Sequence, residues 1–314
     1  MIRAGLQIPN FTYPGVAPDA LFDRVADVAV TAEEAGFDTI MVMDHFYQLP
    51  LLGPPDHEMF EAYTLLAAIA ARTSTAKLGT LVTGVTYRNP ALVAKIVTTL
   101  DVISHGRAIL GIGAAWYEPE HVGMGFDFPP TRERLDRLEE AVQICRALFN
   151  NERPTFEGRY YRTKDARNVP APLRQGGIPI MIGGSGEKRT LRLVAQYADM
   201  CNVHGGPETL RYKLEVLRGH CDAVGRDPEG ITTTRLGTLM LAGDADEAAR
   251  TREFVVGMAG DAFGEQFTIG TADEVVQQVE QLVATGIDCL IFNMPLTDPD
   301  TVERAGKLLT SNFA

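Results

Sequence analysis

An acidic residue and a histidine stand side by side where an apolar stretch of the chain ends. The stretch begins at Thr39, and Asp44 and His45 directly follow Met43. Histidine exchanges a proton near neutral pH, and a carboxylate beside it can fix which ring nitrogen carries the hydrogen. The pair therefore indicates acid–base chemistry at His45. A structural alternative stays open, in which Asp44 caps a turn and His45 makes all its hydrogen bonds inside the fold.

A glycine-rich turn further along the chain could bind an anion. It follows an apolar run and opens a helical pattern, so free backbone N–H groups and the helix dipole would face a ligand. Lys188, Arg189 and Arg192 add positive charge nearby, and we expect the turn to hold a phosphate group. Arg189 replaces the third glycine of a dinucleotide fingerprint, which argues against that motif; a plain tight turn is the alternative. The turn consists of Gly183, Gly184, Ser185 and Gly186.

Two further segments could contact a flat ligand. In the first, Thr83, Gly84 and Val85 follow an apolar run, and glycine lets a backbone approach a ring closely. An ordinary turn explains the same residues. In the second, Trp116 and Tyr117 follow a run of small residues. They could pack against an aromatic ligand, or they could anchor a loop in the protein interior.

Other polar residues form weaker patterns. Four of them could converge near the segments above, but their spacing requires no metal ion, and surface or supporting roles are favoured. They are Glu118, Glu120, His121 and His204. The four cysteines lie far apart and match neither a zinc site nor a redox dithiol, so we expect buried thiols. We therefore expect no metal site.

Eight short apolar runs must position these residues. Near-continuous apolar runs are typical of parallel strands buried on both faces, and amphipathic helical patterns separate them. Eight strands, each followed by a helix, close a (β/α)8 TIM barrel, whose reacting groups lie at the C-terminal ends of its strands. All the candidate segments above follow such ends. The expected strands are Arg3–Pro9, Thr39–His45, Lys77–Thr83, Ala108–Ala114, Ile178–Gly183, Met200–His204, Thr233–Leu241 and Cys289–Met294.

The length of the chain fits one such barrel. It has 314 residues, enough for two ordinary domains or for one barrel of about 250 residues with insertions. The alternation runs through residues 1–314 without a linker, which favours a single domain. Residues 150–177 and 258–270 interrupt the alternation and are expected to be insertions. Loops of this length often cover active sites.

The composition excludes several classes of protein. The net charge of −12 argues against nucleic acid or an anionic membrane as a partner. The N-terminal residues read as a strand and lack the pattern of a signal peptide. The longest apolar run, Leu65–Ala71, is far shorter than the ~20 residues that span a bilayer. We therefore expect a cytoplasmic protein that acts on a small molecule.

Together these segments resemble the luciferase-like flavin/deazaflavin oxidoreductase family. They look most like its branch that depends on the deazaflavin coenzyme F420, mainly because of Asp44-His45. The resemblance covers nearly the whole chain. It is carried by Asp44-His45-Phe46, Thr83-Gly84-Val85 with Arg88-Asn89-Pro90, Leu110-Gly111-Ile112-Gly113, Phe156–Tyr161 and Gly183-Gly184-Ser185-Gly186.

The resemblance implies roles for individual residues. Asp44 would hydrogen-bond the cofactor ring, and His45 would lie beside the reacting ring carbon. Gly84-Val85 would hold the non-prolyl cis peptide that bulges against the ring in this family. The resemblance also implies a homodimer. The remaining cofactor contacts would come from Thr83, Trp116, Tyr117 and the phosphate-binding turn Gly183–Gly186.

One departure bears on the substrate. The sugar-phosphate dehydrogenases of this family carry a catalytic glutamate a few residues after the fourth strand, where this chain has Trp116. An apolar or aromatic substrate is therefore expected. The expected reaction is hydride transfer between F420 and a carbonyl, an alcohol or an activated C=C bond, because a deazaflavin carries hydride and reacts poorly with oxygen. The alternatives are an FMN-dependent monooxygenase and, from another class, a non-catalytic flavin- or deazaflavin-binding protein.

Overall fold

Eight parallel strands form a closed barrel in the computed structural model, which describes residues 2–259, 264–295 and 298–313. Each strand pairs in parallel with its neighbours, and pairing of the last strand with the first closes the ring. The predicted (β/α)8 barrel is therefore confirmed. In ring order the strands are β1 (Arg3–Ile8), β2 (Thr39–Val42), β3 (Lys77–Thr80), β5 (Ala108–Gly113), β8 (Ile180–Gly183), β9 (Met200–Val203), β10 (Thr232–Leu241) and β12 (Cys289–Asn293).

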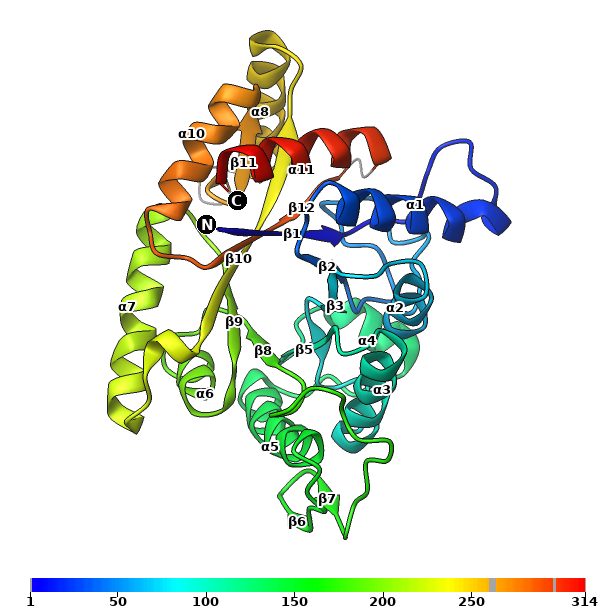
Figure 1. Ribbon diagram of the computed structural model, residues 1–314, viewed down its shortest axis with the longest axis vertical. Coiled ribbons are helices and arrows are strands. Elements are labelled where there is room, and N and C mark those ends of the chain that lie inside the picture. Colours follow the sequence, from blue (N-terminus) through cyan, green and yellow to red (C-terminus); the bar gives the residue numbers. More distant parts are fainter. Residues whose placement is uncertain (1, 260–263, 296–297, 314) are drawn as a thin grey trace.

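Helices surround the barrel, as Figure 1 shows. One face of α1 (Leu21–Glu34) is buried, and the chain turns after that helix at Gly36, whose φ of +93° suits glycine. On α3, Asn89 caps the N-terminus by accepting the Ala91 N–H. The α-helices are α1 (Leu21–Glu34), α2 (Ala62–Ala70), α3 (Pro90–Ile103), α4 (Glu118–Met124), α5 (Thr131–Phe149), α6 (Thr190–Tyr197), α7 (Pro207–Val224), α8 (Ala245–Ala259), α10 (Ala272–Val283) and α11 (Pro299–Phe313).

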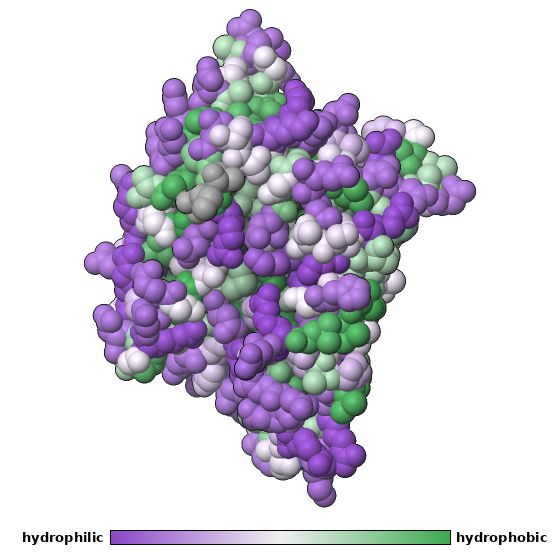
Figure 2. All heavy atoms as spheres, in the orientation of Figure 1, coloured by the Kyte–Doolittle hydropathy of each residue, from purple (hydrophilic) through white to green (hydrophobic). Residues whose placement is uncertain are grey.

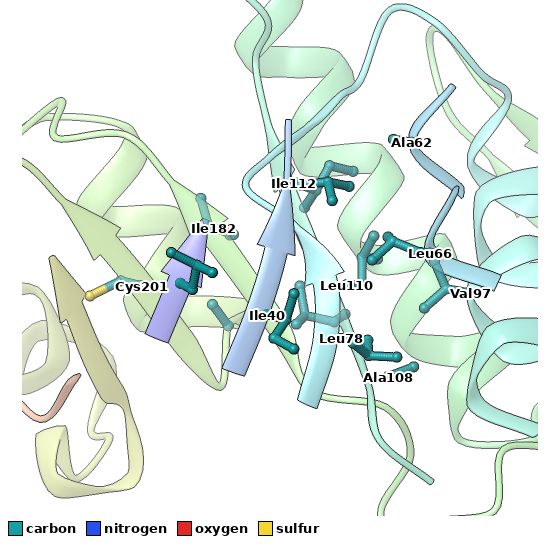
Figure 3. Packing of buried hydrophobic residues seen from close by; sticks show 14 of the residues in the cluster. Ile40, Ala62, Leu66, Leu78, Val97, Ala108, Leu110, Ile112, Ile182 and Cys201 are labelled. Atoms are coloured by element: carbon teal, nitrogen blue, oxygen red, sulfur yellow. The ribbon is translucent and has the colours of Figure 1, made fainter. Parts of the chain in front are cut away.

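The core has two layers. The larger layer lies between strands and helices, where Ile40, Leu78 and Leu110 on the strands face Leu66 and Val97 on α2 and α3 (Figure 3). The smaller layer fills the inside of the barrel. This inner cluster consists of Met41, Leu81, Ile109, Met181, Met200, Cys289 and Ile291. Because both faces of each strand are covered, the strands read as continuous apolar runs.

One predicted insertion contains a strand. Part of the stretch 258–270 forms β11 (Phe267–Gly270), which pairs in parallel with the C-terminal half of β10; the expectation of a loop is wrong there. The physical reason is the length of β10, because its last residues extend beyond β12 and need another partner for their backbone groups. Residues 260–263 of this stretch lie outside the described residues.

The other insertion packs on the outside of the helix layer. It contains a short hairpin of β6 (Phe156–Glu157) and β7 (Arg162–Thr163), which projects beyond α5 in Figure 1. The carboxylate of Glu140 on α5 accepts three backbone N–H groups of its tip, and Asn168 bonds to Thr98 on α3.

The surface in Figure 2 is mostly polar, with smaller apolar patches. Within the described ranges, no helix is both long enough and apolar enough to cross a membrane. All four cysteines are free and buried, as expected. Burial raises the pKa of the Cys145 and Cys201 thiols to about 12, so these thiols are poor nucleophiles.

Candidate active site

His45 and Glu120 meet at the C-terminal end of the barrel. His45 follows β2, and Glu120 lies in the first turn of α4, which follows β5. The distance from His45 Nδ1 to Glu120 Oε1 is 2.7 Å. The histidine side chain is 14% exposed, whereas the glutamate side chain is fully buried. A group that can exchange a proton therefore stands at the mouth with a buried carboxyl group behind it.

The Glu120 carboxyl group is ionised. Burial alone would raise its pKa, but hydrogen bonds from His45, Tyr87 and the Phe46 N–H more than offset this effect, and the pKa lies below its ordinary value. The Phe46 N–H donates to Oε2 at 2.8 Å, and the Tyr87 hydroxyl donates to Oε1. Glu120 thus joins three segments of the chain around His45.

Two aromatic rings flank His45. The ring centroids of Trp116 and Tyr117 lie 5.8 Å and 5.9 Å from that of His45, both at nearly perpendicular angles. Trp116 is 60% exposed, whereas Tyr117 is 9% exposed. Tyr117 therefore packs into the protein, as the loop-anchor alternative predicted, whereas Trp116 presents its indole at the mouth. Its contact with an aromatic ligand stays a prediction.

Asp44 is buried and fully engaged by the protein. Arg88 donates to its two oxygens at 2.8 Å and 3.0 Å, and the Gly84 N–H donates at 3.1 Å. Burial raises the pKa of Asp44, while Arg88 and the Gly84 N–H act in the opposite direction by stabilising the carboxylate. Asp44 ties the end of β2 to the segment after β3. A hydrogen bond from Asp44 to a cofactor ring stays a prediction, since its known partners are protein groups.

A bulge interrupts the third strand and projects into the mouth. Gly79 pairs with Ile109 and Thr83 with Ile112, so four steps on this strand oppose three on β5. The non-prolyl cis peptide joins Leu81 to Val82; the expected position at Gly84-Val85 is wrong.

Val82 is a candidate site residue that sequence reasoning missed. A methyl group at Gly113 or Gly183 would come within 2.8 Å of its side chain, so these glycines make room for Val82. The side-chain amide of Gln7 donates to the Leu81 carbonyl at 2.9 Å and holds the bulge from β1. The sequence signal that could have indicated Val82 is the spacing of small residues at the ends of β5 and β8.

The three residues expected to contact the cofactor ring, Thr83, Gly84 and Val85, lie behind the bulge. Thr83 is fully buried and hydrogen-bonded to Tyr63 and Thr80. Gly84 pairs with β5 as part of β4 (Thr83–Gly84), and Val85 is 3% exposed. They support the bulge from the interior, and the partly exposed Val82 stands in front of them.

The glycine-rich turn lies between β8 and α6, as expected. Gly184 has a φ of +119°, which favours glycine, and its N–H is bonded to the Asn202 carbonyl. The Ser185 hydroxyl accepts the His204 N–H at 3.2 Å, which leaves its own hydrogen available. Among the described residues, nothing accepts a hydrogen bond from the N–H groups of Ser185 and Gly186.

The positive charge expected at this turn is largely neutralised. Arg189 bonds to Asp136 at 2.5 Å, and Arg192 lies 3.6 Å from Glu139, both on α5. The expectation of a locally basic turn is therefore wrong for these two arginines. Lys188 stays exposed. Anion binding at the turn depends mainly on backbone N–H groups and the Ser185 hydroxyl.

The weaker candidates separate into different environments. His121 is fully buried, with Nδ1 on the Tyr117 carbonyl and Nε2 on the Thr86 hydroxyl. Burial and nearby Arg235 lower the pKa of His204, and Glu118 is exposed. Of the four, Glu120 alone touches His45. The described residues contain no cluster of side chains suited to a metal ion.

Comparisons with known proteins identify the family and the relatives of this chain. The family model of the luciferase-like monooxygenases matches residues 3–259. An F420-dependent glucose-6-phosphate dehydrogenase of Nocardia farcinica is 31% identical over 306 residues, which cover 87% of this chain and 88% of that protein. A protein of the same name from Kineococcus radiotolerans is 42% identical over 242 residues, covering 74% and 68% of the two chains.

Two solved structures share the fold. The F420-dependent tetrahydromethanopterin reductase of Methanopyrus kandleri has a TM-score of 0.79 at 19% identity, with 99% of this chain and 98% of that chain covered. An F420-dependent secondary alcohol dehydrogenase in complex with an F420–acetone adduct has a TM-score of 0.82 at 21% identity, with the same coverage.

Proposed function

The chain belongs to the luciferase-like monooxygenase family, and we propose that within it the protein is an oxidoreductase that uses coenzyme F420. The observation that carries this proposal is His45, which stands at the barrel mouth, backed by an ionised Glu120 and flanked by Trp116. The relatives named as F420-dependent dehydrogenases cover most of the chain and support the choice of cofactor.

The residues at the mouth fit such a cofactor. Val82 projects over glycines on β5 and β8, so the surface under a flat ring would be small and apolar. The N–H groups of Ser185 and Gly186, with the Ser185 hydroxyl, would hold a phosphate. When bound, a deazaflavin would supply hydride transfer.

The protein would supply orientation and proton exchange. Within the described ranges, no hydrogen-bond partner reaches His45 Nε2, so this atom is available to a substrate. His45 would take the hydroxyl proton of an alcohol as the alcohol is oxidised, or return it to a carbonyl oxygen in the reverse direction. An activated C=C bond would take its proton from the same atom.

The substrate we propose is apolar or aromatic. Trp116 places an indole beside His45, at the position where the sugar-phosphate dehydrogenases of this family carry a glutamate. Glu120 is a poor replacement for that glutamate because it is buried and bonded to His45, Tyr87 and Phe46. We therefore expect weak activity on glucose 6-phosphate, the substrate in the names of the relatives.

A titration tests the cofactor. Purified protein is titrated with F420 and separately with FMN, with cofactor fluorescence as the signal. We expect tight binding of F420 and weak binding of FMN. Tight binding of FMN without F420 would favour the alternative of an FMN-dependent monooxygenase. Binding of F420 without turnover across a panel of ketones, alcohols and enones would favour a non-catalytic binding protein.

We also propose the location, the partners and the assembly of the protein. A cytoplasmic location fits the four unpaired cysteines, because a reducing compartment keeps thiols free. The charge of −12 disfavours nucleic acid and anionic membranes as partners. A single domain over residues 1–314 follows from the uninterrupted alternation of strands and helices, and a homodimer follows from the family resemblance. Sedimentation of the purified protein as a monomer would contradict the dimer.

A further inference from the structure

We propose that Glu120 is a positioning residue that fixes the tautomer of His45. It would keep the hydrogen on Nδ1, so that Nε2 faces the substrate with a free lone pair. This inference deepens the proposed function and rests on it for its catalytic meaning. The tautomer itself depends only on residues of the chain.

The hydrogen bonds around Glu120 determine the tautomer. An ionised carboxylate accepts hydrogen bonds and donates none. Glu120 Oε2 accepts the Phe46 N–H, and Oε1 accepts the Tyr87 hydroxyl and lies 2.7 Å from His45 Nδ1. A hydrogen bond at that distance requires the hydrogen on Nδ1. In neutral His45, Nε2 is then the basic atom.

The same carboxylate would support proton uptake. When a substrate hydroxyl gives its proton to Nε2, the O–H bond breaks, an N–H bond forms and the ring becomes a cation. The carbon that bears this hydroxyl would lose a hydride, which an oxidised deazaflavin would accept when bound, and would become a carbonyl carbon. The cation lies beside a fully buried anion, where charges interact more strongly than in water.

Replacement of Glu120 by glutamine should reverse the tautomer. The Phe46 N–H must donate, so the amide oxygen of Glu120→Gln will occupy the place of Oε2. Its NH₂ group then faces His45 Nδ1 and the Tyr87 hydroxyl and donates one hydrogen to each, since a hydroxyl can also accept. Nδ1 must accept, the hydrogen moves to Nε2, and the basic atom at the mouth is lost. The substitution changes a charge and a hydrogen-bond direction but hardly changes the shape.

Nitrogen NMR tests the tautomer without cofactor. The protein is labelled with ¹⁵N-histidine and held at a pH where His45 is neutral, and the His45→Asn variant identifies its signals among the six histidines. We expect Nδ1–H in the wild type and in Tyr87→Phe, and Nε2–H in Glu120→Gln. The inference is overturned if the wild type carries the hydrogen on Nε2, or if Glu120→Gln leaves it on Nδ1.

Kinetics test the positioning role. We expect kcat to fall roughly 10- to 100-fold in Glu120→Gln, with the Kd for F420 within about twofold, since Glu120 is too buried to touch a ligand. The acid limb of the pH–rate profile should move to lower pH, because the ring cation loses its anion. An unchanged profile would contradict the role. Tyr87→Phe keeps the carboxylate but removes one of its hydrogen bonds, so a shift of the profile confined to Glu120→Gln separates loss of charge from loss of a hydrogen bond.

A matched control accounts for the loss of a buried carboxylate. Asp101 is 1% exposed and accepts the Leu173 N–H at 2.8 Å, on the outer side of α3. Asp101→Asn should leave the His45 tautomer and the pH–rate profile unchanged. If the wild type neither binds F420 nor turns over, the proposed function fails, yet the NMR result still decides the tautomer.

Discussion

The two halves of the mouth are built by different physical means. At the ends of β2 and β5, contacts between side chains hold the mouth together, namely the Asp44–Arg88 ion pair and the His45–Glu120 hydrogen bond. At the end of β8, the mouth is formed mainly by backbone. Gly184 has a φ of +119°, and N–H groups of the turn lack partners among the described residues.

This difference shows which of the two tasks, proton exchange or phosphate binding, needs charged side chains. Proton exchange needs a group whose protonation can change, and buried charged partners control that change. A phosphate keeps its charge, so fixed N–H dipoles can hold it without paired side chains. Substitutions on the first half should therefore affect turnover or stability, and substitutions on the second half should affect the affinity for the cofactor.

The largest effect is expected at His45. His45→Ala removes the only group proposed to exchange a proton, so kcat should fall by about 10²- to 10⁴-fold. The Kd for F420 should change by less than about threefold, because the turn at β8 is intact. Stopped-flow kinetics with saturating F420 measure the first quantity, and fluorescence titration measures the second. A His45→Ala enzyme with wild-type turnover would remove the distinction between the two halves.

The stability of an Arg88 variant tests the importance of the buried charges. Arg88→Met leaves the Asp44 carboxylate with only the Gly84 N–H as a partner and also removes the ion pair of Arg88 with the half-exposed Glu61. Breaking a buried pair costs about 3–5 kcal/mol. Burial already raises the pKa of Asp44, so the variant should fold with this group protonated and lose more stability as the pH rises. Urea unfolding at pH 5 and pH 8 measures the difference.

The matched control for Arg88 is an exposed ion pair. Arg153 and Asp165 lie on the surface, with side chains 54% and 51% exposed. Arg153→Met should produce no measurable loss of stability at either pH, because exposed pairs are screened by solvent. Equal effects of the two substitutions would show that burial of the Asp44–Arg88 pair is unimportant.

Gly184 tests the backbone half. Its φ of +119° is strained for a side chain, at about 1–3 kcal/mol, and a new methyl group would disturb the turn that meets the phosphate. We expect Gly184→Ala to weaken F420 binding about tenfold while bound enzyme keeps most of its kcat. Gly286→Ala, at φ +88° with nothing within 4 Å of the new carbon, should lose stability without losing affinity. Equal Kd values in both variants would contradict the role of the turn.

The barrel could be predicted from the sequence because strand patterns are local. Runs such as Ala108–Gly113 are apolar throughout, and a strand buried on both faces must be so. The sequence also placed His45 at the mouth, since the C-terminal ends of parallel strands converge. It gave no sign of β11, which exists because β10 extends past its other neighbour.

The partners within the site could not be predicted, because they are set by distances between segments. Glu120 lies 75 residues from His45, and the sequence shows only that both follow strands. The bulge was misplaced by a few residues because pairing register decides where it falls, and register appears only when β3 and β5 are aligned. Likewise, the sequence does not show that acidic residues of α5 neutralise Arg189 and Arg192 near the turn.

Arg189 therefore gives the smallest expected effect and the sharpest test of that last point. The sequence alone places its positive charge beside the phosphate-binding turn, whereas the structure pairs it with Asp136 at 2.5 Å. If backbone groups hold the phosphate, Arg189→Gln should change the Kd for F420 by less than about twofold at 0.15 M salt, where exposed charges are screened beyond ~8 Å. Lys188→Gln, which removes the exposed neighbouring charge, serves as the comparison. A tenfold loss in Arg189→Gln would mean that Arg189 leaves Asp136 when the cofactor binds, and that side-chain charge also builds the second half of the mouth.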